Sequence, residues 1–138
     1  MILGAIVRSR GVTLMELLVV LVVAALLAAV ALPSYLSILR KGRRSDAVDA
    51  SVAVLQAQER YRANNLSYAL TLAALGQAST SAAGQYSLVL SGASGAGYVL
   101  TLSAVAGSAQ AGDTGCTALT VTVSNGSPSY APSTCWSR

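Results

Sequence analysis

The sequence has no histidine and no phenylalanine, and only 10 % of its 138 residues are charged. Without histidine, the chain lacks the most frequent general acid–base group of enzymes and a frequent ligand of zinc and haem iron. A solvated globular protein carries about 25 % charged residues, whereas 54 % of this chain is hydrophobic. We therefore expect no catalytic residue, no metal and no cofactor, and we do not expect an ordinary water-soluble monomer.

Charge is also scarce in the C-terminal half. The formal net charge is +4, but beyond Arg62 the only base is Arg138 and the only acid is Asp113. Because phosphate-driven binding of nucleic acid needs several cations, nucleic acid is an unlikely partner for this half. We interpret the basic cluster at residues 40–44 as a contact with lipid headgroups or as a solvated helix face.

The chain divides into four zones. Residues 1–11 form a short basic leader, and residues 12–39 contain an uncharged run of 23 residues, long enough to cross a bilayer as a helix. Residues 40–62 are polar with helical periodicity. Residues 63–138 are rich in Ser, Thr, Gly and Ala and alternate between apolar and polar positions. We expect a membrane or core helix, an amphipathic helix half and one small domain.

The two helical zones predict one long helix over residues 12–62, about 75 Å at about 1.5 Å per residue. The first zone is apolar on all sides and must lie in lipid or protein. Pro33 interrupts it and predicts a kink near Ala29, because proline removes a backbone donor. In residues 40–62 the apolar positions follow a 3, 4 spacing, so this half is expected to lay one face on an apolar surface.

The last zone predicts a loop followed by an antiparallel sheet. Alternation indicates strands at residues 86–90, 98–102 and 119–123, and Asn125-Gly126 predicts a tight turn into a short fourth strand at 129–131. A single helical turn is expected at 72–75. Such a small sheet makes a thin core, so we expect an α+β fold in which the long N-terminal helix packs on it.

Cys116 and Cys135 are the only cysteines. A disulfide between them would close a loop of about 20 residues and contribute on the order of 3 kcal/mol by the loop-entropy model. It would require an oxidising compartment. Two free buried thiols are the alternative, and the spacing matches no C-x-x-C redox or metal motif.

Glu16 stands at the start of the uncharged run, where a carboxylate is costly and marks a functional candidate. Cleavage after Gly11 would release the α-amine of Val12, four residues before Glu16. That amine would be within reach of the carboxylate along the same helix or on a neighbouring one. The Val12 amine is therefore a candidate partner for the Glu16 carboxylate.

The segment G-V-T-L-M-E-L, followed by about twenty apolar residues that include Pro33, resembles the prepilin signature of type IV pilins and pseudopilins. The later run from R-R-S-D-A to N-x-x-S-Y and the terminal Cys135-Trp136 are similar to PilE-like minor pilins. The resemblance implies the type IV pilin fold and a fimbrial subunit, most simply a minor pilin of a type IV pilus. Cell adhesion and twitching motility are among the roles that it implies.

The resemblance also implies how such a subunit is processed. A prepilin peptidase would cut between Gly11 and Val12 and methylate Val12, where the family usually has phenylalanine. Glu16 would neutralise the N-terminal amine of an adjacent subunit. The helix would anchor a single-pass precursor in the bacterial inner membrane, with the C-terminal domain in the periplasm. An assembly platform would then move it into the core of an extracellular pilus.

Several alternatives stay open at this point. A type II secretion pseudopilin would share the leader and the helix, and a DNA-uptake minor pilin would share the whole architecture. Ala29-Val30-Ala31 resembles an ordinary signal-peptidase site, which would leave a soluble protein starting at Leu32. A generic single-span anchor would fit the apolar run but would leave Glu16 unexplained.

Overall fold

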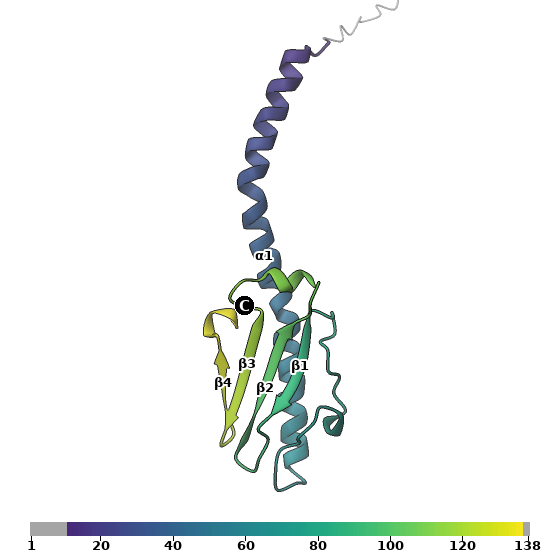
Figure 1. The fold of residues 1–138 in the computed structure, drawn as a ribbon, viewed down its shortest axis with the longest axis vertical. Coiled ribbons are helices and arrows are strands. Elements are labelled where there is room, and N and C mark those ends of the chain that lie inside the picture. The colour runs from purple at the N-terminus through teal and green to yellow at the C-terminus, as the bar shows by residue number, and fades with distance from the viewer. Residues whose placement is uncertain (1–10, 137–138) are drawn as a thin grey trace, which may run out of the picture. The chain divides into compact units, whose positions relative to one another are not determined.

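The computed structural model describes residues 11–136 and divides the chain at residue 36 into two compact units. Helix α1, Leu14–Arg62, contributes to both units (Figure 1). The single long helix is therefore confirmed, although it begins at Leu14 and not at Val12. Of the predicted leader, only Gly11 lies among the described residues.

In the first unit, α1 is exposed at every position from Leu14 to Leu36. It continues through Pro33 without a break in the assigned helix, and the kink stays a prediction. In the part of the chain that the structure describes, α1 is the one helix with the length and composition needed to cross a membrane. Within the residues that the structure describes, none of this apolar surface is buried.

The second unit contains a four-stranded antiparallel sheet with the strand order β1-β2-β3-β4 (Figure 1). Its strands are β1 Tyr86–Ser91, β2 Gly97–Ala104, β3 Ala118–Ser124 and β4 Ser127–Ala131. The four strands lie at or within a few residues of the predicted segments. The α+β architecture predicted from the periodicities is confirmed.

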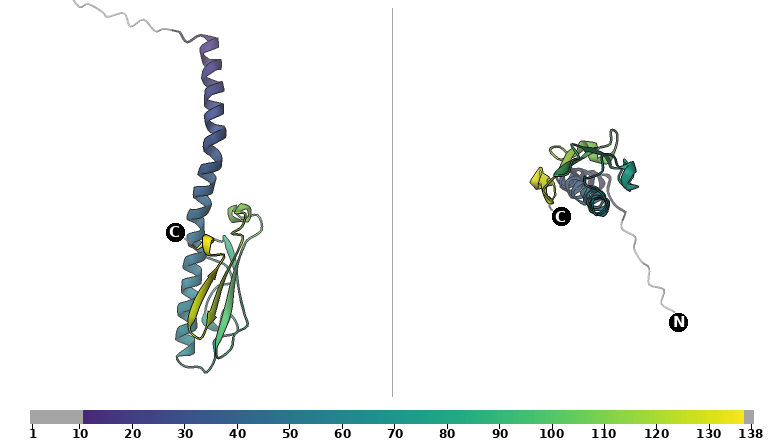
Figure 2. Two further views of the ribbon diagram at one scale, coloured as in Figure 1. Left: turned by 90° about the vertical axis from the view of Figure 1, so that its left-hand side faces the viewer. Right: turned by 90° about the horizontal axis from the view of Figure 1, so that it is seen from below.

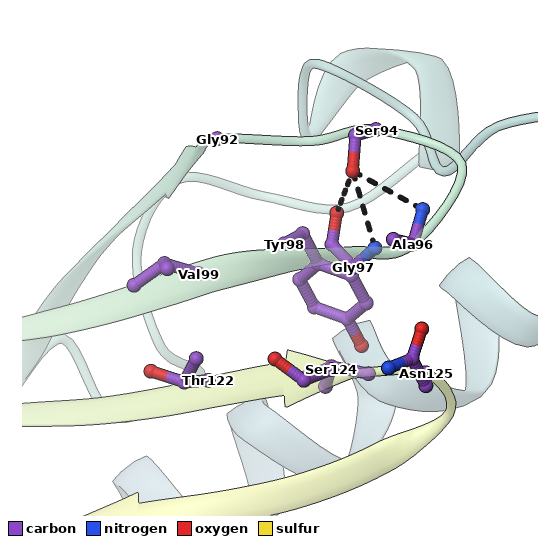
Figure 3. Close-up of a pocket in the computed structure, with 10 residues that line it drawn as sticks. Gly92, Ser94, Ala96, Gly97, Tyr98, Val99, Thr122, Ser124 and Asn125 are labelled. Atoms are coloured by element: carbon purple, nitrogen blue, oxygen red, sulfur yellow. Dashed lines mark hydrogen bonds between the residues drawn. The ribbon is translucent and has the colours of Figure 1, made fainter.

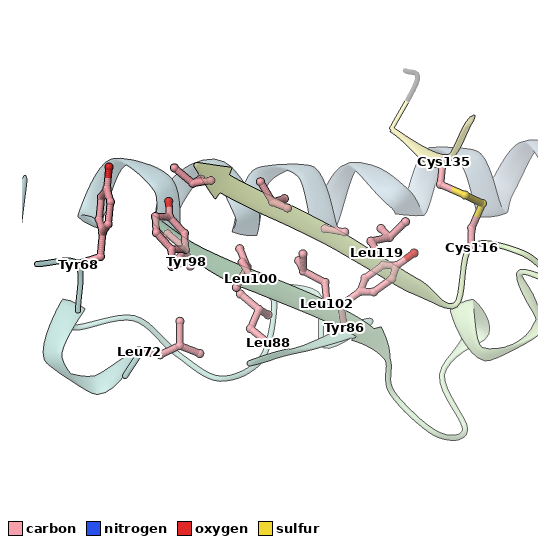
Figure 4. Close-up of a cluster of buried hydrophobic side chains, with 14 residues drawn as sticks. Tyr68, Leu72, Tyr86, Leu88, Tyr98, Leu100, Leu102, Cys116, Leu119 and Cys135 are labelled. Atoms are coloured by element: carbon pink, nitrogen blue, oxygen red, sulfur yellow. A yellow bond between two sulfur atoms is a disulfide. The ribbon is translucent and has the colours of Figure 1, made fainter. Parts of the chain in front are cut away.

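The sheet packs one face against residues 37–62 of α1, as the side view in Figure 2 shows. Alternate residues point to opposite faces of a strand, so β2 buries Tyr98, Leu100 and Leu102. These side chains meet Ala47 and Val54 of α1 in one core cluster (Figure 4). The amphipathic half of the helix thus supplies the second layer that the thin sheet needs.

Local backbone requirements fix one end of the sheet, where β2 begins beside the turn that joins β3 and β4. Asn125 and Gly126 adopt φ of 50° and 80°, which makes a two-residue hairpin between β3 and β4. At Gly97, a Cβ atom would lie only 1.9 Å from the carbonyl oxygen of Val123, so no larger residue fits there. The residue types at these positions therefore hold the strands in register.

Three short 3-10 helices complete the unit. η1, Ala73–Leu75, matches the predicted single turn, and the hydroxyl of Thr71 accepts a hydrogen bond from the N–H of Ala74 at 3.2 Å. η3, Ser133–Cys135, follows β4. η2, Ala109–Gly112, lies between β2 and β3, where no helical turn is expected from the sequence. Gln110 of η2 contacts α1 near the start of the second unit, where its Nε2 donates to the Arg40 carbonyl at 3.3 Å.

Candidate functional site

The start of α1 is capped by a threonine. The Oγ1 of Thr13 accepts a hydrogen bond from the N–H of Glu16 at 3.2 Å, and the Thr13 carbonyl accepts one from the N–H of Leu17 at 3.2 Å. Gly11 and Val12 precede the helix and are exposed. The structure thus places the predicted cleavage site in an accessible segment one residue before the helix cap.

Glu16 occupies the first turn of α1 and is exposed. A carboxylate is favourable in the first turn, because the unpaired N–H groups there carry partial positive charge. It is the only charged residue between Leu14 and Leu39. Any partner of its charge in an apolar setting must therefore come from the N-terminus of this chain or from another molecule.

The apolar half of α1 offers a surface for close helix packing. Small alanines occur in pairs among larger aliphatic residues, and most of the large side chains in this half are more than 50 % exposed. Small residues let helix backbones approach each other in an apolar environment, where the hydrophobic effect contributes little to association. The alanines are Ala24, Ala25, Ala28 and Ala29.

Arg44 corrects the interpretation of the basic cluster. Its Nε and Nη2 donate to the two carboxylate oxygens of Asp113 at 2.7 and 2.9 Å, and the two side chains are only 12 % and 7 % exposed. Arg44 is therefore neither a headgroup contact nor part of a solvated face. It joins α1 to the segment after η2 through a bidentate ion pair.

Gln110 extends this pair into the core. Its Nε2 donates to the hydroxyl of Tyr86 and to Asp113 Oδ2, each at 2.9 Å, and the side chain is fully buried. The Arg44 guanidinium holds the pKa of the Asp113 carboxyl below its usual range. Burial raises the pKa of the Tyr86 phenol. The network consequently holds a charged carboxylate and a neutral phenol at the junction of helix and sheet.

The long loop after α1 is anchored on the helix at two places. The Asp46 carboxylate accepts hydrogen bonds from Ser81 Oγ at 2.5 Å and from the N–H of Ala83 at 3.0 Å. Farther along, the buried side-chain amide of Gln58 exchanges two hydrogen bonds with the backbone of Ala69, at 2.8 and 3.0 Å. The loop is therefore fixed to α1 before it enters the sheet.

Cys116 and Cys135 form a disulfide that closes the C-terminal segment. Both residues are buried, at 6 % and 1 % exposure. The bond ties η3 to the segment just before β3, and Cys135 lines a pocket together with residues of α1. This bond is consistent with folding in an oxidising compartment.

A shallow pocket of about 230 Å³ lies between the loop after β1 and the turn after β3 (Figure 3). At its rim, Ser94 Oγ accepts hydrogen bonds from the N–H groups of Ala96 and Gly97, both at 3.2 Å. The lining contains hydroxyl, amide and backbone groups but no acidic or basic side chain. Among the described residues, no group of three or more acidic, histidine or cysteine side chains is placed to hold a metal ion.

A long helix with an exposed apolar N-terminal half, followed by a four-stranded antiparallel sheet, is the architecture of a type IV pilin. A family model described as "Type IV minor pilin ComP, DNA uptake sequence receptor" matches residues 33–120. Since the match covers more than half of the chain, the chain belongs to this family of type IV minor pilins and assembles with other pilin subunits. No curated protein matches the sequence.

The matched range starts at Pro33, so it does not include Gly11, Val12 or Glu16. Roles for these residues rest on the local sequence and on their place at the start of α1. The structure joins the two predicted cysteines in a disulfide. Glu16 belongs to the other unit of the chain. Asp113 was not identified from the sequence as a structural residue. A usable signal was present, because Asp113 is the only acid after Arg62 and the preceding helix has an excess of arginines.

We predict that Asp113→Asn lowers the free energy of unfolding of the 37–138 unit by about 2–3 kcal/mol at pH 7, because Arg44 keeps its charge in a partly buried place. Stabilisation by a carboxyl with a lowered pKa is complete above about pH 4, the ordinary Asp value, and is lost as the pH falls through the folded-state pKa. Urea unfolding from pH 2 to 7 should therefore show that the free energies of unfolding of the wild type and of Asp113→Asn converge below about pH 4.

The double variant Arg44→Gln/Asp113→Asn is the matched control. If the ion pair is the cause, the double variant should be no less stable than the worse single variant. Additive losses from the two single variants would contradict this account.

Proposed function

We propose that this chain is a minor structural subunit of a type IV pilus that enters the filament through the N-terminal half of α1. The observation that carries the proposal is the membrane-length apolar helix that no other part of residues 11–136 covers. The family match favours a pilus over a type II secretion pseudopilus. The role requires no catalytic residue, metal or cofactor in the chain.

In the proposed precursor, α1 anchors the chain in the bacterial inner membrane and the C-terminal domain lies in the periplasm. The disulfide supports this orientation, because it needs an oxidising compartment. A prepilin peptidase cuts between Gly11 and Val12 and methylates the new N-terminus. Both residues are exposed and lie outside the helix, where a peptidase can reach the bond.

Assembly then moves the apolar helix from lipid to protein. Since both surroundings are apolar, the transfer itself releases little hydrophobic free energy. A pair between the Glu16 carboxylate of one subunit and the Val12 amine of its neighbour supplies a specific, strongly attractive contact in a low-dielectric setting. Close packing of the alanine pairs farther along the helix sets the position of one helix against the next.

We predict that Glu16→Ala and Glu16→Gln leave the full chain inserted and cleaved but reduce its content in sheared filaments at least tenfold. An unpaired amine buried among apolar side chains costs several kcal/mol, and each 1.4 kcal/mol is a factor of ten. Immunoblots of membrane and sheared-filament fractions measure both quantities. Glu16→Gln separates the charge from the size of the side chain, so normal incorporation of this variant would remove the charge pair from the mechanism.

A second candidate function is the binding of DNA, favoured by the printed description of the matched family as a DNA uptake sequence receptor. The charges of the second unit restrict where DNA could bind. Residues 63–136 contain no lysine or arginine, so among the described residues of this unit cationic phosphate contacts would have to come from α1. Arg60 and Arg62 close its last turn, and Arg62 lies over the Tyr68 ring and donates to the Gly95 carbonyl.

Gel shifts with the 37–138 unit and duplex DNA separate the two candidates. The structural role alone predicts no retarded band at micromolar protein. Binding through Arg60 and Arg62 would give a slope of about −2 for log K against log salt, because each neutralised phosphate contributes about −0.9. A band that is lost in Arg60→Gln but kept in Arg43→Gln would establish DNA binding at this end of the helix.

A further inference from the structure

An apolar groove runs along one face of α1 in the second unit. Its first part is a pocket of about 400 Å³ over the helical face made by Ile38, Lys41, Gly42, Ser45 and Val48, with Cys135 on one side. A second pocket of about 200 Å³ shares Val48 and continues to Val52, Tyr130 and Trp136. We call residues 38–52 of this face, together with the wall of β4 and η3, the α1–β4 groove.

The wall of the α1–β4 groove is held in place by contacts of its own. The rings of Tyr130 and Trp136 meet edge to face with centroids 5.0 Å apart. Trp136 Nε1 donates to the Ala131 carbonyl at 3.2 Å, and the disulfide fixes η3 at the neighbouring residue. The groove is therefore built by the fold, and Ile38, Val52 and Tyr130 keep 65 %, 43 % and 43 % of their surfaces exposed.

Gly42 lies in the floor of this groove. A Cβ atom added to Gly42 would meet nothing within 4 Å, so the chain itself does not require a glycine there. Glycine weakens a helix interior relative to alanine. A glycine with open space above it does, however, let the backbone of another element approach closely. Ser45, the next small residue on this face, widens the same opening.

Two observations say what fills the groove. The chain belongs to a family of filament subunits, and its own apolar helix at residues 14–36 is exposed throughout and needs cover once it leaves the lipid. The groove begins at Ile38, two residues after that segment in the sequence of the same helix. Residues 38–52 extend over about 21 Å of helix, enough for four turns of a partner helix.

We propose that the α1–β4 groove receives the apolar helical segment of a neighbouring pilin subunit, with the partner backbone seated over Gly42. The proposal rests on the proposed function as a filament subunit. It assigns a recognition role to the second unit, where Tyr130 and Trp136 form one wall of the contact. Lys41 lies at the rim, where its aliphatic stem covers apolar surface and its ammonium stays in water.

The test compares Gly42→Leu with Gln56→Leu in the full chain. The leucine at position 42 has open space within its own chain, so the variant is expected to match wild type in membrane fractions. Its ratio of filament to membrane protein should fall at least tenfold, because the side chain occupies the place of the partner helix. Gln56 is exposed on α1 and lines none of the described pockets, so Gln56→Leu should stay within twofold of wild type.

The outcomes separate this proposal from the one on which it depends. Wild-type protein absent from sheared filaments would overturn the proposed function and this inference with it. Wild-type and Gly42→Leu protein present at equal ratios would overturn the groove alone. If Gly42→Leu is present at reduced levels in the membrane, a cross-linking experiment tests the groove contact instead.

For that cross-link, benzoyl-phenylalanine replaces Val52 in the full chain and filaments are irradiated. An adduct to a peptide from the apolar helix of a second pilin is the result expected. An adduct to phospholipid, or one to a different part of a pilin, would overturn the proposal.

Discussion

The apolar half of α1 is the constraint on which the rest of the structure depends. It carries one acid in a membrane-length run, and no other part of the described chain covers it. Such a surface is stable only in lipid or against other protein. A type IV minor pilin meets both conditions in turn, because it begins in a membrane and ends in a filament.

The second unit shows how a thin sheet is stabilised beside such a helix. Tyr86, Leu100 and Leu119 are fully buried against α1, but a four-stranded sheet offers few such positions. Specific polar contacts add to them, with Asp113 joining η2 to the helix and Asp46 holding the long loop. The disulfide ties η3 to the segment before β3.

The parts of the fold set by local sequence could be predicted. The 3, 4 spacing after residue 40, the alternation around Leu100 and the Asn125-Gly126 turn each report a short stretch of backbone. The Arg44–Asp113 pair could not be predicted, because its members are 69 residues apart and meet only once η2 has formed. The α1–β4 groove could not be predicted either, because it too is formed by residues that are distant in the sequence. Its wall depends on where the hairpin and the disulfide place Tyr130 and Trp136.

The central claim is that proteolysis frees an amine close to Glu16 and thereby prepares the helix for assembly. Intact-mass and N-terminal peptide analysis of the protein from sheared filaments tests it most directly. The account predicts a mature chain that begins at Val12, with Cys116 and Cys135 oxidised. A filament protein that begins at Leu32, or one that retains Met1, would contradict it.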